Sequence, residues 1–273
     1  MKKIVKYIAL IIASLLLLLI LLWNVAIPEE FLKETIEKSV RTPYSMKLKG
    51  FSKSIVIPFK VNIAEVKLFQ NTTVMAVISN AVISVKPEEV LSGNLFCTFT
   101  GTISNGTINL TYTAPILKFS EKTLTATLDS VQLSGLGLIK KVGIKGSGLV
   151  SGNFTLNASN KGEGVFEVKK CRFEDFHGGG LYIPAKYITG ITGKLSTDAE
   201  NVNIESIYLT AENISCRISG KISNGSLDVA IQIMPDADFK DKTILFLLKQ
   251  YEVSQGVYVV RVVRKLSVLK LPF

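Results

Sequence analysis

Apolar and polar residues alternate along most of the chain beyond residue 43, which is the pattern of β-strands that have one apolar face. The alternation is clearest in two segments, 124–128 and 229–233. Because successive side chains of a strand point to opposite faces of its sheet, the apolar residues of each segment share a face. The residues predicted to form this apolar β-face are Leu124, Ala126, Leu128, Val229, Ile231 and Ile233.

The turns between these segments help to predict the fold class. Asn105-Gly106 and Asn224-Gly225 are signals of type I′ hairpin turns, and both stand between alternating segments. The spacing of Ile63 and Val66 interrupts the alternation and predicts a bulge. We expect a mainly β protein, built as an extended, twisted antiparallel sheet that is groove-like or sandwich-like, with a few short helices.

The two hairpin turns lie in similar surroundings. The segment 101–109 (GTISNGTIN) resembles the segment 220–228 (GKISNGSLD), 119 residues further along. Similarity at a fixed offset is typical of repeated modules. It predicts that the β-rich domain, residues 43–273, consists of two related halves, about 43–145 and 146–273.

A short helix is predicted directly before the β pattern. Leu32, Ile36 and Val40 recur every four residues, which places one apolar stripe along a helix. Pro28 suits the first turn of a helix, because the missing N–H would have no partner there. We therefore expect an amphipathic helix over residues 28–42.

A second helix is predicted at residues 236–251. Its run 244–248 is apolar almost all round, so we expect it to be buried or to cap an open apolar end of the sheet. Asp236, Asp238 and Asp241 near its start could suggest a calcium loop, but the glycine and glutamate that such a loop requires are missing. Helix capping explains these acids better.

The chain begins with a long apolar run. Residues 7–27 carry only Ser14 and Asn24 as polar interruptions. A helix of this length spans about 30 Å, the hydrocarbon thickness of a bilayer, and the lysines before it favour a cytoplasmic N-terminus. The residues assigned to this membrane anchor are Lys2, Lys3, Lys6, Ile8, Leu15, Leu19, Leu22 and Trp23. We expect Trp23 at the lipid–water interface.

The predicted topology is that of a single-pass protein of the inner membrane. Residues 1–27 form the cytoplasmic flank and the transmembrane anchor, 28–42 a juxtamembrane helix, and 43–273 a periplasmic domain. The alternative is a cleaved signal peptide, whose apolar region is usually about 7–15 residues long and ends in small residues. The apolar stretch 8–23 exceeds that length, and Asn24 fits such a cleavage site poorly, so a retained anchor is favoured.

Charge and cysteine content exclude several classes of protein. The formal net charge is +10, or +7 without the three N-terminal lysines, and the basic residues are scattered. Nucleic-acid binding is therefore not indicated. Cys97, Cys171 and Cys216 are too widely spaced for a zinc motif and allow at most one internal disulfide. We expect Cys97 and Cys216 to pack as small apolar side chains.

No constellation of catalytic residues is evident. His177 is the only histidine, and the glycines beside it lack the spacing of a phosphate-binding loop. A metal or acid–base site at His177 is the weaker alternative to an ordinary surface histidine. No serine lies in a GxSxG motif. We predict no catalytic residue, no cofactor and no metal site, and a protein that is not an enzyme.

The layout as a whole resembles the AsmA-like envelope proteins and especially the type II secretion system protein N family. The features that carry the resemblance are the basic N-terminus with a single anchor, Pro28–Leu32, Met46–Gly50, the Gly-x-Ile-Ser-Asn-Gly hairpins, the segments 199–209 and 218–222, and the closing stretch from Gly256–Tyr258 to Lys270–Pro272. Members often carry glycine within the last strand, where this chain has Arg264-Lys265-Leu266.

This resemblance implies a non-enzymatic accessory component of type II protein secretion that is anchored in the inner membrane. The alternative is an AsmA-like protein that binds or transfers lipid in an apolar β groove. The expected partners are the lipid bilayer of the inner membrane and either the secretion machinery or phospholipid. The alternation itself is the same for an open groove and for a closed core.

Overall fold

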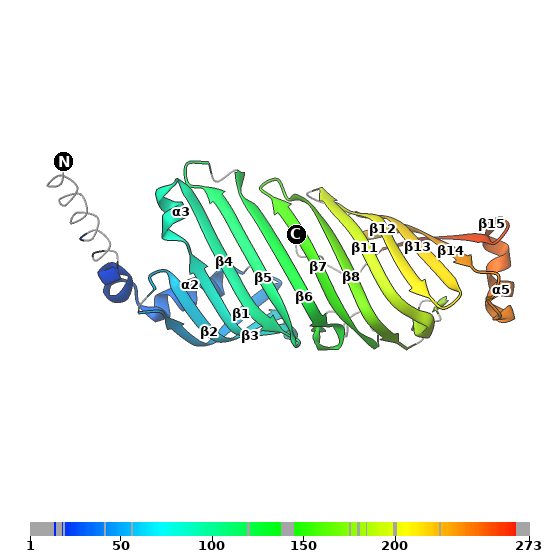
Figure 1. Ribbon diagram of the computed structural model, residues 1–273, viewed down its shortest axis with the longest axis horizontal. Helices are drawn as coiled ribbons and strands as arrows, with labels where there is room; N and C mark the ends of the chain where they lie inside the picture. Colours follow the sequence, from blue (N-terminus) through cyan, green and yellow to red (C-terminus); the bar gives the residue numbers. More distant parts are fainter. Residues whose placement is uncertain are drawn as a thin grey trace, which may run out of the picture.

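Most of the chain folds into one long antiparallel sheet. The computed structural model describes residues 14, 18, 20–40, 42–55, 57–118, 121–137, 145–174, 176–178, 181–183, 185–198, 201–223 and 225–265. Strands account for 64% of the described residues, and 14 of them form one open sheet. Figure 1 shows this sheet as an elongated, twisted layer with the N-terminal segment at one end. The predicted mainly β, antiparallel architecture is confirmed, as a single layer.

The strands lie side by side nearly in the order of the chain. From one edge to the other they are β1 (Tyr44–Lys53), β2 (Lys60–Gln70), β3 (Thr73–Val85), β4 (Asn94–Ile103), β5 (Gly106–Pro115), β6 (Thr123–Gln132), β7 (Gly146–Asn157), β8 (Lys161–Phe173), β11 (Ile188–Asp198), β12 (Asn201–Ala211), β13 (Ile214–Ser223), β14 (Ser226–Pro235), β16 (Val257–Lys265) and β15 (Glu252–Ser254). A separate two-stranded ribbon contains β9 (Phe176–Gly178) and β10 (Leu181–Ile183). Because β6 pairs with β7, strands from both predicted halves belong to the same sheet.

Short helices stand at the ends of the sheet and in its connections. They are η1 (Leu22–Ala26), α2 (Glu29–Ser39), α3 (Pro87–Leu91), η3 (Leu133–Gly135), η4 (Ala185–Tyr187), α5 (Lys242–Leu248) and η5 (Lys249–Tyr251). α2 lies within the predicted segment 28–42, and its residues Leu32 and Ile36 pack against the core.

The late helix is shorter than predicted. α5 begins only at Lys242, because Asp241 lies at its start and accepts a hydrogen bond from the backbone N–H of Ile244 (3.1 Å). Leu248 is buried, whereas Phe246 and Leu247 are 76% and 52% exposed. The expectation of a buried apolar run is therefore wrong for these two residues, since this short helix has one face in solvent.

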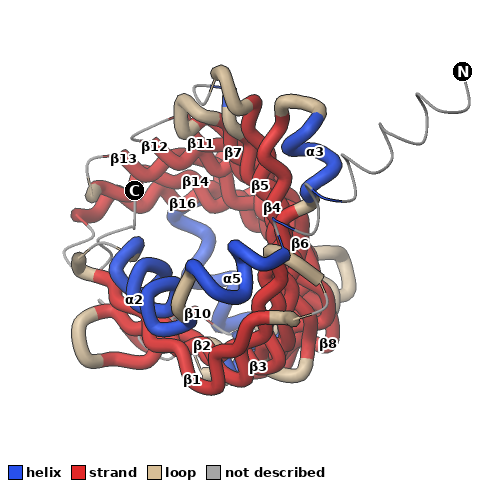
Figure 2. The backbone as a smooth tube through the Cα atoms, turned by 90° about the vertical axis from the view of Figure 1, so that its left-hand side faces the viewer, coloured by secondary structure: helices blue, strands red, loops and turns tan. Residues whose placement is uncertain are grey.

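Local irregularities bend the sheet. The register shifts between β3 and β4, between β6 and β7, and between β7 and β8. At these three places one strand carries a residue in the left-handed region: Asn80 (φ 51°), Ser130 (φ 55°) and Lys170 (φ 54°). Bulges of this kind bend a strand and increase its twist. In Figure 2 the strands curve round, and α2 and α5 lie on the inside of the curve.

The irregularity predicted between Ile63 and Val66 is found at Ala64. The ladders on both sides of β2 pass from Glu65 to Ile63 and leave Ala64 without a paired residue. Gly50, which would face Ala64 across β1, has a left-handed backbone (φ 65°). As a result Ile63 and Val66, three residues apart, both lie in the core at 2% exposure.

One of the two predicted hairpin turns lies at its predicted residues, and the other is shifted. Gly225 (φ 69°) lies in the turn between the paired residues Ser223 and Ser226, as predicted. In the other hairpin Ile103 pairs with Gly106, so the turn residues are Ser104 and Asn105, both with positive φ. The turn thus begins one residue earlier than predicted, and Gly106 belongs to β5.

Gly106 is needed because β6 approaches it closely. A Cβ atom at this position would lie 2.5 Å from the carbonyl oxygen of Asp129 and 2.5 Å from the backbone nitrogen of Val131. These atoms belong to the bulged part of β6, so they cannot move without disturbing the ladder. The glycine is therefore a packing requirement of the sheet and not of the turn.

We expect Gly106→Ala to destabilise the protein by about 1–3 kcal/mol, because the added methyl group would collide with the backbone of β6. The measurement is the free energy of unfolding in detergent, followed by circular dichroism. Gly190→Ala is the matched control, since the nearest atoms to its Cβ would lie 3.8–4.0 Å away. Equal stabilities of the two variants would contradict this account.

Candidate functional site

The sheet has one continuous apolar face. Residues paired directly across antiparallel strands lie on the same face, so the register can be followed from strand to strand. One such chain of pairs is Leu124, Leu156, Gly162, Thr197, Val202, Ile222 and Leu227. Since Val229, Ile231 and Ile233 follow Leu227 at alternate positions, the register places the six predicted face residues on the same side.

We call this side the inner face, because it carries α2, which lies on the inside of the curve in Figure 2. Large apolar side chains occupy it from one end of the sheet to the other. Representative members are Leu48, Val66, Ile78, Phe99, Ile108, Leu128, Phe154, Val168, Ile191, Leu209, Ile218, Ile231 and Val260. The face therefore extends across β1 to β16.

At the N-terminal end the inner face is closed. Trp23 is only 5% exposed and belongs to a core cluster with Leu48, Val61 and Ile63. Leu32 of α2 packs against the same cluster. Ordinary core packing accounts for this part of the sheet.

Farther along the sheet the inner face is only partly covered. Leu124 is 38% exposed, and on the later strands Leu195, Leu209, Ile218 and Ile231 are all half-buried. Large aliphatic side chains of a completed core are normally buried almost fully. The described part of the chain thus leaves apolar surface of β6 and of β11 to β14 accessible.

Glycines opposite phenyl rings shape the middle of the inner face. The ring of Phe154 lies over Gly164, and the ring of Phe166 lies over Gly193, where any Cβ atom would collide with it. The missing side chains let both rings lie against the sheet. This combination gives a smooth apolar surface at β7, β8 and β11.

The opposite, outer face carries cross-strand ion pairs, together with exposed apolar side chains such as Val165 (52%) and Val263 (61%). Lys194 and Glu205 form a cross-strand ion pair (2.9 Å), and Arg261 makes two hydrogen bonds to Asp228 (both 3.0 Å). The hydrogen bond from Arg261 lowers the pKa of Asp228, and that from Lys194 lowers the pKa of Glu205. All four groups are solvent-exposed, so they maintain a hydrated surface and contribute little stability.

The edge of the sheet at β1 is covered by carboxylates of α2. Glu37 accepts a hydrogen bond from the backbone N–H of Leu48 (2.7 Å), and Glu29 accepts one from that of Lys53 (2.9 Å). Free edge amides invite pairing with another strand. These two contacts occupy them and hold α2 beside β1.

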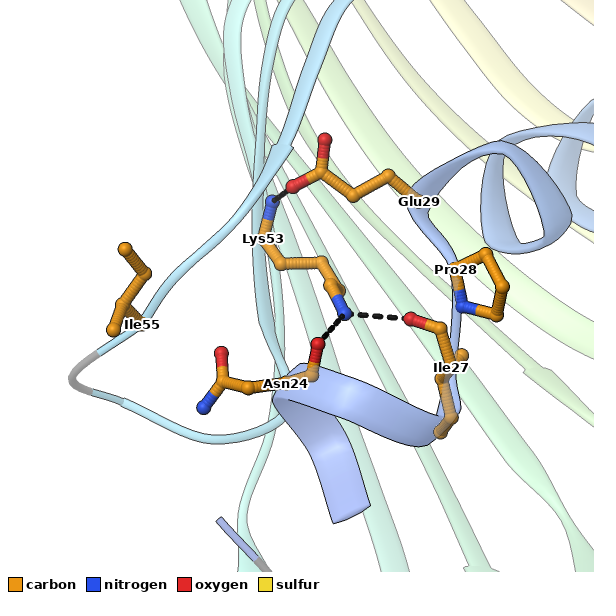
Figure 3. A pocket seen from close by; sticks show the side chains of 6 residues that line it. All are labelled: Asn24, Ile27, Pro28, Glu29, Lys53 and Ile55. Carbon is orange, nitrogen blue, oxygen red and sulfur yellow. Dashed lines mark hydrogen bonds between the residues drawn. The ribbon is translucent and has the colours of Figure 1, made fainter. Parts of the chain in front are cut away.

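A joint at Lys53 connects η1 to the sheet, next to an open pocket of about 440 Å³ (Figure 3). The Lys53 ammonium group donates hydrogen bonds to the carbonyl oxygens of Trp23 (2.8 Å), Asn24 (3.2 Å) and Ile27 (2.6 Å). The indole N–H of Trp23 in turn donates to the carbonyl oxygen of Ser54 (3.2 Å). Positive charge is favourable at the carbonyl end of a helix, so Lys53 stabilises this end of the N-terminal segment.

The pocket is better explained as part of this joint than as a ligand site. The three N–H donors of Lys53 each have a carbonyl partner, and one carboxylate oxygen of Glu29 accepts from the Lys53 backbone (Figure 3). The remaining lining residues are Asn24, Ile27, Pro28 and Ile55.

Most of the predicted anchor lies outside the described residues. This applies to Lys2, Lys3, Lys6, Ile8, Leu15 and Leu19. Of the other two, Leu22 is 47% exposed, and Trp23 packs in the protein core, where its ring centroid lies 5.2 Å from that of Phe59. The residues that the structure describes contain no helix of sufficient length and hydrophobicity to cross a membrane. The anchor stays a prediction.

The three cysteines are free thiols in apolar surroundings. Cys97 and Cys216 lie on the inner face, paired with Tyr112 and Ile233, and Cys171 is buried beside Val168. Burial raises the pKa of all three thiols, in the case of Cys216 to about 11. Such thiols stay protonated and do not act as nucleophiles near neutral pH.

The described residues offer no cluster of acidic, histidine or cysteine side chains that could hold a metal ion. His177 belongs to β9, and its side chain lies outside the described part of the structure. Asp241 caps α5, as expected for the acids in this region.

Comparison with known proteins yields no relative. No protein-family model, no curated protein and no solved structure matches the chain.

Cys216 should react slowly with thiol reagents in the folded protein. A rise of its pKa from 9.0 to about 11 lowers its thiolate fraction near pH 8 roughly 100-fold. The measurement uses a variant with Cys97→Ala and Cys171→Ala, in which Cys216 is the remaining thiol. Its rate of thiol–disulfide exchange is compared between the folded protein and the protein unfolded in urea. Since the unfolded thiol ionises first, stability should also fall as the pH rises from about 9 to about 11. Equal exchange rates in the two states would contradict burial of the thiol.

Lys53→Met should destabilise the protein by about 1–2 kcal/mol, because the carbonyl groups at the end of η1 lose a charged donor and exchange it for water. The measurement is again the free energy of unfolding in detergent. Lys49→Met on the same strand is the control, since Lys49 is exposed. Equal losses for both variants would show that the joint is unimportant.

Proposed function

We propose that the protein is a non-enzymatic, single-pass protein of the inner membrane whose sheet shelters the acyl chains of lipids in the periplasm. One observation carries the proposal: the inner face is apolar across β1 to β16, and several of its aliphatic side chains from β11 to β14 (Leu195, Leu209, Ile218 and Ile231) are only half-buried, although Ile204 and Val229 are buried. The cross-strand ion pairs of the outer face support it, because they place charged groups on the side opposite to the half-buried aliphatic side chains.

The dimensions of the sheet suit an elongated apolar ligand. At roughly 4.8 Å between neighbouring strands, 14 strands span roughly 60 Å. Each methylene group of a hydrocarbon chain gains about 0.8 kcal/mol when it leaves water for an apolar surface. A hydrocarbon chain laid across the inner face would bury both its own surface and the exposed part of side chains such as Leu124.

The predicted anchor supports the same function. An apolar segment over residues 7–27 would keep the sheet beside a bilayer, which is the source of such ligands. The joint at Lys53 and Trp23 would transmit the position of this segment to β1 and β2. The accessory role in type II secretion, which the family resemblance implies, stays a separate prediction without a supporting contact in the described structure.

Photocrosslinking from the two faces tests the proposal. A photoreactive amino acid placed at Leu124 or Ile231, on the inner face, should crosslink to radiolabelled phospholipid in cells. The same group at Thr125 or Gln232, the next residues on the same strands, points to the outer face and is the matched control. We expect at least roughly ten-fold more lipid adduct from the inner positions, because the outer positions face water.

Two results would contradict the proposal. One is an equal yield of lipid adduct from both faces. The other is protein, purified in mild detergent, that contains no phospholipid by native mass spectrometry and gives only protein crosslinks from Leu124 and Ile231. The second pattern would favour a protein partner on the inner face, as expected for a component of a secretion machine.

A further inference from the structure

Several connections at one end of the strands expose large apolar side chains to solvent. Ile55 and Ile57 in the β1–β2 connection are 78% and 49% exposed. Leu91 of α3 is 83% exposed, and Leu117 in the β5–β6 connection is 95% exposed. None of these side chains is buried in the core, and each lies at the tip of a connection.

These connections lie at the same end of the sheet. In an antiparallel sheet that follows the chain, alternate connections fall at the same end, so those after β1, β3 and β5 are together. Hydrogen bonds join them directly: the backbone N–H of Val85 donates to Phe59 (3.1 Å), and that of Ile116 donates to Gly93 (2.8 Å). We call the tips Ile55, Ile57, Leu91 and Leu117 the loop rim.

The loop rim is continuous with the N-terminal segment. Ser54, beside Ile55, accepts the hydrogen bond from the Trp23 indole, and the ring of Phe59 contacts that of Trp23. The N-terminal segment is therefore joined at Trp23 directly to the β1–β2 part of the loop rim.

Several other described turns of the sheet are polar. At the opposite end the β2–β3 turn has Asn71 and Thr72, and the β4–β5 turn has Ser104 and Asn105. At the same end as the loop rim, but farther along the sheet, the β7–β8 turn carries Ser159 and its polar neighbours. Among the described connections, exposed apolar tips thus occur next to the N-terminal segment and, at the far end of the sheet, in α5, where Phe246 is 76% exposed.

Charge around the loop rim is nearly balanced. The lysines near the tips are Lys60, Lys86, Lys118 and Lys122, and the acids are Glu88, Glu89 and Glu121. Lys118 and Glu121 pair with each other (3.5 Å). Apolar insertion, and not attraction of a basic patch to anionic lipid, is therefore the interaction that this surface can offer.

We propose that the loop rim inserts into the surface of the lipid bilayer beside the anchor. This rests on the membrane attachment in the proposed function and adds a second contact, which fixes the orientation of the sheet. Exposed aliphatic tips clustered next to a membrane-spanning segment gain most of their burial free energy at the interfacial layer of that membrane. With the loop rim in the interface, the strands β1 to β6 meet the membrane at one end, and the inner face begins at the lipid surface.

The test uses the full-length protein in liposomes of phosphatidylethanolamine and phosphatidylglycerol. In a background with Cys97→Ala, Cys171→Ala and Cys216→Ala, a single cysteine at position 55, 91 or 117 carries an environment-sensitive fluorophore. Thr72→Cys reports the opposite end of the strands, and Ser159→Cys reports the same end farther along the sheet. We expect fluorescence at the three rim positions to rise at least about two-fold over the two controls, and to be quenched by lipids brominated in their acyl chains.

The possible outcomes distinguish a failure of the loop rim contact from a failure of the membrane anchor. Protein that floats with liposomes, with protected rim positions, supports the proposal. Protein that floats, with rim positions as exposed as Thr72→Cys, overturns the loop rim contact and leaves the anchor intact. Protein that does not float overturns the anchor and with it both proposals. A rim that is protected without any quenching by brominated lipid would indicate contact with a second protein copy, and would also overturn the proposal.

Discussion

A single sheet with one apolar face must find cover for that face, and this constraint governs the rest of the molecule. The hydrophobic effect drives the curvature of the sheet and the packing of α2 and Trp23 on its inner side. These elements are sufficient for β1 to β3, where Ile63 and Val66 are almost fully buried. They do not extend over β11 to β14, so the same constraint that explains the fold also identifies the surface that is available for a ligand.

At the N-terminal end, where the inner face is closed, polar contacts hold the elements together, and the apolar packing around them strengthens these contacts by excluding water. Lys53 binds three carbonyl groups beside a buried indole, and the carboxylates of α2 bind edge amides of β1. Each of these contacts lies partly out of water, where hydrogen bonds to charged groups are worth more than on an open surface. The N-terminal segment, α2 and the first two strands are consequently joined by direct contacts at the end where the sheet begins.

The sequence was sufficient for the features that depend on neighbouring residues. Alternation in β6 and β14 predicted the shared apolar face, and the interrupted spacing at Ile63 and Val66 predicted the irregularity at Ala64. Features that depend on distant segments were missed. The turn at Ser104 is displaced by one residue because β6 requires a glycine at position 106, and Trp23 was assigned to lipid although Ser54 and Phe59 surround it. Composition alone cannot show such contacts, since their partners lie 23 or more residues away in the sequence.

The order of the strands has a consequence for the way the chain is made. Nearly every strand pairs with its neighbours in the sequence, so the contact order of this large sheet is low. Because the chain is synthesised from its N-terminus, each strand can therefore be added to the edge that is already formed. Addition is favoured at the later edge, because carboxylates of α2 already bind two backbone amides of the edge at β1. The sheet is then a structure that can assemble strand by strand during synthesis, without waiting for its last residue.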